Sequence, residues 1–385
     1  MPTALICCDK FKGSASSREV SAALAKGLEF SGCRAVALPL ADGGDGTLEV
    51  FDDLGYHRRT AMVRGVDGEW VSAEYSLEDA PVGPLTGGRR TAVIEIARAC
   101  GLEMVSVDGE VPAPESARQA GSWGVGDLII AALDEGVGRI ILGLGGSATT
   151  DAGSGMAEAL GVVFRDASGG MVTRVRDMAS IAAVDLDRLD PRLAEVEVVI
   201  ASDVRNPLCG PDGAAAVYGP QKGLAPEDID EVDSAVQGFA AVVEDALGMS
   251  GTAELPGAGA AGGLGFMALG LLGAQMRSGV GLVLEETGLV GALGTADLVI
   301  TGEGRLDAQT LSGKAPAGVA ERARENDVPV VAVCGQNQID ADQASALFTA
   351  VYSLVDYEPD VEKCLRDPLP ILERIGFEIG TGLNR

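Results

Sequence analysis

The stretch TALICCDKFKGSASSREVSAALAKGLEF (3–30) decides the fold of this chain. Residues 3–9 form a short apolar run that is typical of a β-strand, and the apolar residues then recur at helical spacing. Ser16 and Glu19 match the S-x-x-E pattern of a capping box, so a helix is expected to begin near Ser17. A buried strand followed by a loop and an amphipathic helix is the building unit of a parallel α/β sheet.

A second unit of the same kind follows directly. A strand is expected over residues 33–41, then the loop ADGGDGT (41–47), then a short helix. Asp42 and Asp45 stand among glycines and have no apolar neighbours within this loop. Because glycine lets the backbone turn tightly or approach a ligand closely, the loop is a candidate functional segment.

The pattern changes at about Tyr56 and returns near the end of the chain. A hairpin with its turn at Asp67-Gly68 opens a stretch of mixed helices and strands, in which residues 91–102 are expected to form one strand. Strands are expected again over 296–302 and 328–335, and one helix over 361–375.

The simplest arrangement of these elements is one parallel sheet built from both chain ends. We expect residues 1–60 and 290–385 to form this domain, with strand 3–9 beside strand 296–302, and residues 61–289 to form an inserted mixed α/β domain. Ligands of open α/β sheets bind beyond the carboxyl ends of the strands, so the active site is expected in the cleft between the two domains.

Composition narrows the function classes. The 385 residues carry a net charge of −28, which argues against a nucleic-acid partner because phosphate backbones are bound by clustered lysine and arginine. The seven cysteines form no C-x-x-C pair, and no signal peptide is evident, so a cytoplasmic location is expected. The uncharged stretch 255–276 contains a G-x-x-x-G match, but its glycines favour a loop that leads into a buried helix over a membrane span.

The sequence leaves little room for histidine chemistry. His57 is the single histidine and precedes two arginines at the start of the hairpin, where a solvated surface position is expected. Ser-His and Cys-His nucleophiles and histidine-rich metal sites are therefore disfavoured, and a base is expected to be a carboxylate or a lysine. A Walker-type phosphate loop is also absent, because Ser312-Gly313-Lys314 lacks both the loop length and the following hydroxyl.

Two functions stay open on the residues of the loops taken singly. GLGGSA (143–148) follows an apolar strand and has Asp166 about twenty residues further on, which resembles the dinucleotide loop of an NAD-dependent Rossmann dehydrogenase acting on a small hydroxy acid. Against this, hydroxyls and Asp151 follow the loop at once. A nucleotide-binding module without catalysis would need phosphate loops, but not the carboxylates beside them.

The loops at the predicted strand ends carry what phosphoryl transfer needs. Such transfer uses donors for the phosphates, carboxylates for Mg²⁺, and a carboxylate that takes the proton of the acceptor hydroxyl. Lysines, glycines and hydroxyls recur in the loops KFKGS (10–14) and GLGGSATTD (143–151) and at the helix that follows Lys314. The loop carboxylates are Asp42, Asp45, Asp203, Glu303 and Asp307.

Six ordered motifs carry a specific resemblance. CDKFKGSAS, PLADGGDGT, LGLGGSATTDAGSG, SDVRNPLCGPDGAAAVYGPQKG, GAGAAGGLG and DLVITGEGRLDAQTLSGKAPAGVA match, in order, the motif series of the type I glycerate kinase family, from about residue 3 to residue 376. The resemblance implies a flavodoxin-like domain from both termini with an inserted mixed α/β domain. It also implies phosphorylation of D-glycerate by ATP with Mg²⁺, usually to 2-phosphoglycerate and less often to 3-phosphoglycerate.

The departures from the family pattern are small. Thr150-Asp151-Ala152 stands where the pattern usually has Asn-Asp-Gly, and Asp45 stands where it commonly has Glu. These changes concern fine substrate preference and leave the reaction in place.

Roles for individual residues follow from their chemistry. Asp45 or Asp203 is expected to be the base with Lys12 as a further catalytic residue, and Asp42, Glu303 and Asp307 are expected to hold Mg²⁺ or substrate hydroxyls. The residues expected to contact nucleotide or substrate are Lys10, Ser14, Gly145, Gly146, Ser147, Thr149, Asn206, Lys222, Arg305 and Lys314. We also expect a small-molecule substrate, no membrane partner, and a monomer or homodimer.

Overall fold

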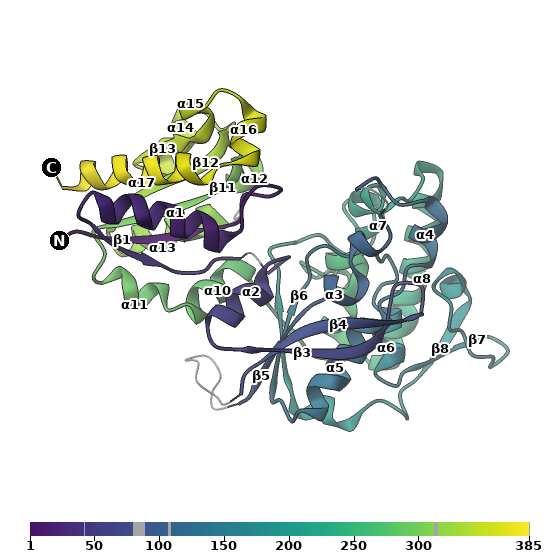
Figure 1. Ribbon diagram of the computed structural model, residues 1–385. Coiled ribbons are helices and arrows are strands. Elements are labelled where there is room, and N and C mark those ends of the chain that lie inside the picture. The colour runs from purple at the N-terminus through teal and green to yellow at the C-terminus, as the bar shows by residue number, and fades with distance from the viewer. Residues whose placement is uncertain (42, 80–88, 107–108, 312–314, 385) are drawn as a thin grey trace. The chain divides into compact units, whose positions relative to one another are not determined.

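The computed structural model describes residues 1–41, 43–79, 89–106, 109–311 and 315–384. The chain divides into two compact units, which are treated separately: a terminal unit of residues 1–42 with 280–385, and an inserted unit of residues 43–279 (Figure 1). The boundaries differ from the predicted ones at residues 60 and 290. Residues 57–60, for example, begin a strand of the inserted sheet.

The terminal unit is a parallel sheet with the strand order β13-β12-β11-β1-β2. Its strands are β1 (Thr3–Cys8), β2 (Arg34–Ala37), β11 (Leu298–Leu306), β12 (Val330–Asn337) and β13 (Ala350–Ser353). All neighbours run parallel, and Ala4 of β1 lies opposite Leu298 of β11, so the predicted pairing of the two chain ends is confirmed. Numbered along the unit, the order is 2-1-3-4-5, which is the flavodoxin-like arrangement.

Helices cover this sheet. They are α1 (Ser17–Phe30), α10 (Gly279–Glu286), α11 (Leu289–Leu293), α12 (Ala308–Leu311), α13 (Ala315–Glu325), α14 (Ala341–Leu347), α15 (Leu354–Tyr357), α16 (Val361–Arg366) and α17 (Leu369–Leu383). Figure 1 shows α1 and α17 side by side. They cross at glycines, because a Cβ on Gly27 would lie 2.0 Å from the carbonyl oxygen of Glu373. The expected capping box of Ser16 and Glu19 begins α1.

Three predicted elements differ in length from those in the structure. The strand predicted over 33–41 ends at Ala37, because Pro39 cannot donate a ladder hydrogen bond. The helix predicted over 361–375 is two helices, α16 and α17, since a proline disfavours helical dihedrals at the residue before it, here Asp367. The strand predicted over 91–102 ends at Glu95 and continues as a short helix, whose Ala-Arg-Ala sequence favours that conformation.

The inserted unit contains a mixed sheet of order β10-β9-β6-β5-β4-β3 and a separate pair, β7-β8. The strands are β3 (His57–Arg64), β4 (Trp70–Leu77), β5 (Thr91–Glu95), β6 (Arg139–Gly143), β7 (Val163–Asp166), β8 (Ile181–Asp185), β9 (Glu197–Ala201) and β10 (Gln275–Arg277). The strands from β10 to β5 run parallel, and the predicted hairpin β3-β4 completes the sheet in antiparallel pairing.

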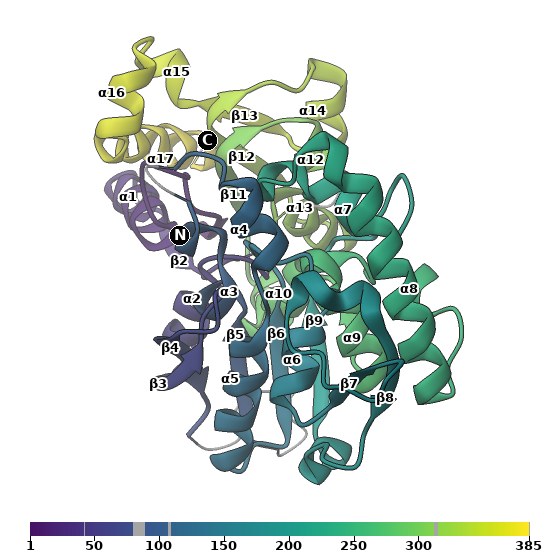
Figure 2. The same cartoon turned by 90° about the vertical axis from the view of Figure 1, so that its right-hand side faces the viewer.

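Helices pack on both the sheet and the loops of this unit. They are α2 (Thr47–Asp53), α3 (Ala97–Cys100), α4 (Pro114–Gln119), α5 (Trp123–Asp134), α6 (Ser154–Ala159), α7 (Ala214–Tyr218), α8 (Ile229–Leu247) and α9 (Leu264–Leu271). Figure 2 shows α5 and α6 over one face of β5 and β6. In the described part of the chain, no helix is both long and apolar enough to cross a bilayer. The glycine-rich stretch 255–276 leads into the buried helix α9, as predicted.

Candidate active site

The carboxyl ends of three neighbouring strands meet at one edge of the inserted sheet. Gly143, the last residue of β6, lies opposite Glu95 at the end of β5 and opposite Ala201 at the end of β9. The loops that follow these strands therefore begin at the same level. Asp203, Asn206 and the predicted loop from Gly145 to Thr149 all follow these ends.

Gly43 and Gly44 of the loop ADGGDGT lie against this edge. A Cβ on Gly43 would lie 2.5 Å from the carbonyl oxygen of Ala201, and one on Gly143 would lie 2.5 Å from the carbonyl oxygen of Gly43. Side chains at these positions would collide with backbone, so glycine is required for close approach of the strand ends. Asp45 follows this contact and is exposed. Asp42 lies outside the described residues.

The turn after β6 offers backbone donors. Gly146 has φ of 71°, in the left-handed region. Within the described residues, the N–H groups of Gly145 and Gly146 donate to no acceptor, whereas the amide of Ala148, two residues after Gly146, donates to the carbonyl of Cys100 at 2.8 Å. Successive amides in such a turn form a concavity that binds anions. This is the strongest candidate anion site on the edge.

Lys222 lies buried beside this turn. It ends the short 3₁₀ helix Pro220–Lys222, and only 3% of it is exposed. Its Nζ donates to Oγ of Ser147 at 2.9 Å and to the carbonyl oxygen of Thr149 at 2.6 Å. Burial lowers the pKa of Lys222 to about 8. The lysine predicted to contact phosphate thus holds the loop through Ser147 and Thr149.

Asp151 anchors the far end of the same loop, a role that the sequence reasoning missed. It is fully buried and accepts hydrogen bonds from the N–H and hydroxyl of Ser122 at 2.9 and 2.7 Å. The amides of Gly153 and Gly155 also donate to it, each at 3.1 Å. Burial raises the pKa of Asp151, and these hydrogen bonds oppose the rise. Four donors around one buried carboxylate fix the loop before α6 begins.

The glycine-rich stretch before α9 supports the loop from a second side. A Cβ on Gly262 would lie 1.8 Å from the carbonyl oxygen of Thr149, and the amide of Ala152 donates to the carbonyl of Gly262 at 2.9 Å. Ala152 itself has φ of 52°, at a position where the family pattern usually has glycine. Non-glycine residues adopt this region at a cost of about 1 kcal/mol.

Asn206 and Asp203 both lie in the loop after β9, but their surroundings differ. Nδ2 of Asn206 donates to the carbonyl of Asp212 at 2.9 Å, and its Oδ1 accepts from the hydroxyl of Tyr218 at 2.7 Å. The Asn206 side chain is thus engaged in the structure of its own loop. Asp203 is exposed.

Glu95 and Arg98 are charged residues at this edge that the sequence reasoning did not select. Glu95 is 1% exposed and accepts from the amide of Leu48 at 2.8 Å and from Nε of Arg98 at 2.9 Å. Burial raises the pKa of Glu95, and the contacts with Leu48 and Arg98 oppose the rise. A carboxylate inside the apolar run TAVIEIA is the sequence signal that points to Glu95.

In the terminal unit, the loop after β1 carries Lys10, Lys12 and Ser14. Lys12 is exposed, and its backbone N lies 3.4 Å from the position that a Cβ on Gly304 would take, so this loop runs beside the end of β11. The amide of Lys10 donates to Asp9 at 2.7 Å. The hydroxyl of Ser14 donates to the carbonyl of Leu365 at 2.7 Å, which ties it to α16.

Near the end of β11, the hydroxyl of Thr310 contacts two of the predicted metal ligands, Glu303 through its side chain and Asp307 through its backbone. The hydroxyl of Thr310 donates to Oε1 of Glu303 at 2.5 Å and accepts from the amide of Asp307 at 3.0 Å. Arg305 is exposed and donates to the carboxylate of Asp307 at 3.2 Å. Lys314 lies outside the described residues.

Across the described ranges, no three His, Cys, Asp or Glu side chains cluster as a metal site would require. Mg²⁺ commonly uses only one or two carboxylates together with phosphate oxygens and water, and Glu303 and Asp307 carry the oxygen ligands that this ion prefers.

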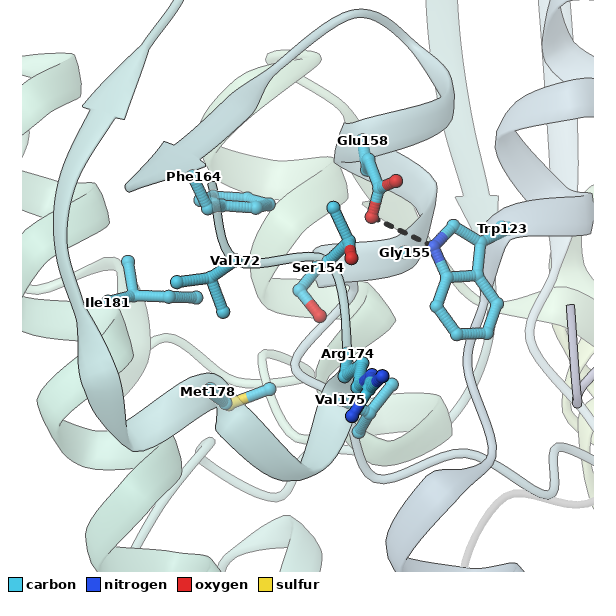
Figure 3. Close-up of a pocket in the computed structure, with 11 residues that line it drawn as sticks. Trp123, Ser154, Gly155, Glu158, Phe164, Val172, Arg174, Val175, Met178 and Ile181 are labelled. Atoms are coloured by element: carbon cyan, nitrogen blue, oxygen red, sulfur yellow. Dashed lines mark hydrogen bonds between the residues drawn. The ribbon is translucent and has the colours of Figure 1, made fainter. Parts of the chain in front are cut away.

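A small pocket elsewhere in the inserted unit contains none of the predicted site residues. It is lined by residues of α5, α6, β7 and the 3₁₀ helix Val175–Ser180 (Figure 3). Nε1 of Trp123 donates to Glu158 at 3.0 Å on its wall, and burial raises the pKa of Glu158. The apolar side chains of Phe164, Met178 and Ile181 close the opposite wall.

The fold and these loops define the class of protein first: an α/β enzyme with a candidate anion-binding loop at the end of parallel strands. Residues 4–383 match the glycerate kinase family. The chain is 40% identical over 385 residues to the glycerate kinase of Bacillus subtilis, covering 99% of this chain and 97% of the relative. It is 39% identical over 332 residues to the glycerate 2-kinase of Escherichia coli, covering 85% and 83%.

A solved structure agrees with these relatives. The crystal structure of a protein from Salmonella typhimurium assigned to glycerate kinase 2 matches with a TM-score of 0.82 at 36% identity, over 100% of this chain and 98% of that one. The chain therefore belongs to the glycerate kinase family, and it is a kinase.

The dehydrogenase alternative finds no support in this assignment, and the fold gives the reason. The acidic residue of a dinucleotide site follows a strand next to the one that carries the glycine-rich loop. Asp166 lies on β7, which pairs with β8 in a two-stranded sheet separate from the sheet that contains β6. Its carboxylate accepts from the amides of Ser168 and Gly170 at 2.8 and 2.9 Å within its own turn.

Proposed function

We propose that this kinase transfers the γ-phosphoryl group of ATP to D-glycerate with Mg²⁺, and that the product is 2-phosphoglycerate. The observation that carries the proposal is the pair of amides at Gly145 and Gly146, without acceptors in the described chain, on the same sheet edge as exposed Asp45. The similarity of this chain to the glycerate 2-kinase of Escherichia coli supports the 2-position over the 3-position.

The inserted unit supplies an anion-binding group and a candidate base. The amides of Gly145 and Gly146 would bind an oxygen of phosphate or carboxylate, with the turn held by Lys222. Asp45 or Asp203 would accept the proton of the attacking hydroxyl. The new bond joins this hydroxyl oxygen to the γ-phosphorus while the bond from that phosphorus to the bridging oxygen of ADP breaks.

The terminal unit supplies the charged residues at the ends of β1 and β11. Lys10, Lys12 and Arg305 would bind anionic oxygens, and Glu303 and Asp307 would hold Mg²⁺. When bound, Mg²⁺ neutralises the charge that develops on the transferred group. A carboxylate beside a phosphate repels it unless a cation lies between them, which favours turnover with Mg²⁺ over a binding module.

The other expectations stay predictions. They are the location of the active site in a cleft between the units, the roles of Asp42 and Lys314, the monomeric or homodimeric state, and the cytoplasmic location. The seven cysteines are free in the structure, and six of them are buried.

One assay tests the proposal. The purified protein is incubated with ATP, Mg²⁺ and D-glycerate while ADP release is followed, and NADH with hydroxypyruvate serves as the control reaction. ADP that forms only when both glycerate and Mg²⁺ are present supports the proposal. Release of ADP without glycerate, or without Mg²⁺, contradicts it. Separation of the phosphoglycerate isomers decides between the 2- and 3-positions.

A further inference from the structure

Two residues outside the predicted site connect the loop of Asp45 to the sheet. The helix α2 begins directly after this loop, and its N-cap, Gly46, has no side chain that could cap it. Glu95 accepts the amide of Leu48 in the first turn of α2 at 2.8 Å. The carboxylate at the end of β5 therefore replaces the missing cap and fixes where the helix starts.

Arg98 adds a second connection to the same turn. Its Nε donates to Glu95 at 2.9 Å and its Nη2 to Glu49 of α2 at 3.1 Å. Burial lowers the pKa of Arg98, but the carboxylates of Glu95, Glu49 and Asp45 raise it above its ordinary value. Asp45 thus lies within electrostatic reach of the guanidinium.

Burial makes this arrangement rigid. The Glu95 side chain is 2% exposed and that of Arg98 is 31% exposed, so the pair extends from the core of the inserted unit to its surface. A buried charged pair in good geometry is costly to break from one side, because the remaining charge is left without its partner. Arg98 pairs with both Glu95 and Glu49, so it has little unpaired positive charge for binding an anionic substrate. Glu49 also pairs with Arg58 at 3.1 Å.

From these contacts we infer that Glu95 and Arg98 are positioning residues that hold Asp45 at the carboxyl edge of the sheet for the transfer reaction. The inference rests on the proposed function, in which Asp45 is a candidate for the base. The pair acts through the first turn of α2 and through the charge of Asp45, and neither residue contacts the reacting atoms.

A double-mutant cycle in kcat tests this role. Arg98→Gln is expected to lower kcat by about 30-fold with the KM for ATP changed by less than about 3-fold. In an Asp45→Asn background, the same change should lower kcat by less than about 3-fold further, because its effect passes through Asp45. Additive losses in the two backgrounds would overturn the inference, and so would wild-type kcat in Asp45→Asn.

Conservative variants separate positioning from general damage. Glu95→Gln keeps an acceptor for Leu48 but loses its charge, so it should retain more kcat than Glu95→Ala. Equal losses in the two variants would count against the inference. Arg192→Gln is the matched control, because Arg192 pairs with Asp190 and Asp134 on the surface of the same unit. It should keep wild-type kcat.

Hydrogen exchange gives a readout that does not depend on activity. The amides of residues 46–50 should exchange at least about 10-fold faster in Glu95→Ala than in wild type, with the rest of the sheet unchanged. Unchanged exchange would overturn the inference. If wild-type protein released no ADP with glycerate, the proposed function would fail, and the exchange result would still decide whether Glu95 holds the loop.

Discussion

Gly44 and Gly145 meet backbone to backbone: a Cβ on Gly145 would lie 2.5 Å from Cα of Gly44. The contact joins the loop that carries Asp45 to the turn whose amides form the candidate anion site. Two segments about a hundred residues apart thus form one structure at the carboxyl edge of the inserted sheet.

Gly145→Ala is therefore expected to displace the two loops. Because the added Cβ meets backbone atoms that cannot rotate away, the substitution should cost about 1–3 kcal/mol in the free energy of unfolding. It should also lower kcat/KM by at least about 10-fold. Urea unfolding and steady-state kinetics measure both.

Gly238→Ala is the control for this substitution. Gly238 lies within α8, where no heavy atom is within 4 Å of an added Cβ, so alanine should stabilise the protein by about 0.5–1 kcal/mol. Its activity should be that of wild type. Equal kinetics for Gly145→Ala and Gly238→Ala would contradict the role given to the loop contact.

Lys222→Met should lower activity with little change in stability near pH 7. The substitution removes a buried charge, which is favourable, but it leaves Ser147 and the carbonyl of Thr149 without their donor. Since the turn then loses its support, kcat/KM is expected to fall by about 10- to 100-fold. Wild-type kinetics in a folded Lys222→Met protein would show that the ammonium has no part in the site.

The lowered pKa of Lys222 leads to a prediction for how the free energy of unfolding depends on pH. Its pKa is lowered from 10.5 to about 8 in the folded protein, so between these values the unfolded chain binds more protons than the folded one. The free energy of unfolding should therefore rise with pH across this window, by about 3 kcal/mol relative to Lys222→Met. Urea unfolding of both proteins at pH 7.5 and 10 measures the difference. If the free energy of unfolding of wild type did not rise relative to that of Lys222→Met as the pH rises, Lys222 would not be a buried ammonium.

Glu303→Gln should raise the Mg²⁺ concentration needed for half-maximal activity by about 10-fold. The amide keeps the size of the side chain and an acceptor for Thr310, but it removes one of the two charges proposed to hold the ion. Activity should recover in large part at saturating Mg²⁺. Glu325→Gln, in an exposed pair with Arg322, is the control. A lowered kcat with an unchanged Mg²⁺ requirement would instead assign Glu303 to the transfer step.

Lys12→Ala tests the charge at the end of β1. Loss of a desolvated charge contact to a phosphate or carboxylate should cost about 2–4 kcal/mol of transition-state stabilisation, read as a fall in kcat/KM. Lys26→Ala removes an exposed lysine that pairs with Glu373 and should leave kcat/KM unchanged. If the two variants behaved alike, Lys12 would not be a catalytic residue.

Much of the fold was predictable because its signals are local. The strand 3–9, the capping box at Ser16 and the return of the same rhythm after residue 296 are set by side-chain periodicity, and they fixed the parallel pairing of the two chain ends. The misplaced boundary at residue 60 arose because pairing is not local. The segment 43–60 reads like a continuation of the first sheet, yet β3 pairs with β4 and Leu48 bonds to Glu95.

The sequence by itself determined the parallel sheet built from both ends, the loops that carry charge at strand ends, and, through six ordered motifs, the family. The tertiary structure alone decided which partners the charged side chains contact. Lys222, which the sequence predicts to face a ligand, donates into the loop 147–149, and Glu95 and Arg98 contact residues nearly fifty positions away. Composition and spacing identify a charge, but its role depends on burial and on which partner lies within hydrogen-bonding distance, and these exist only once distant segments have packed.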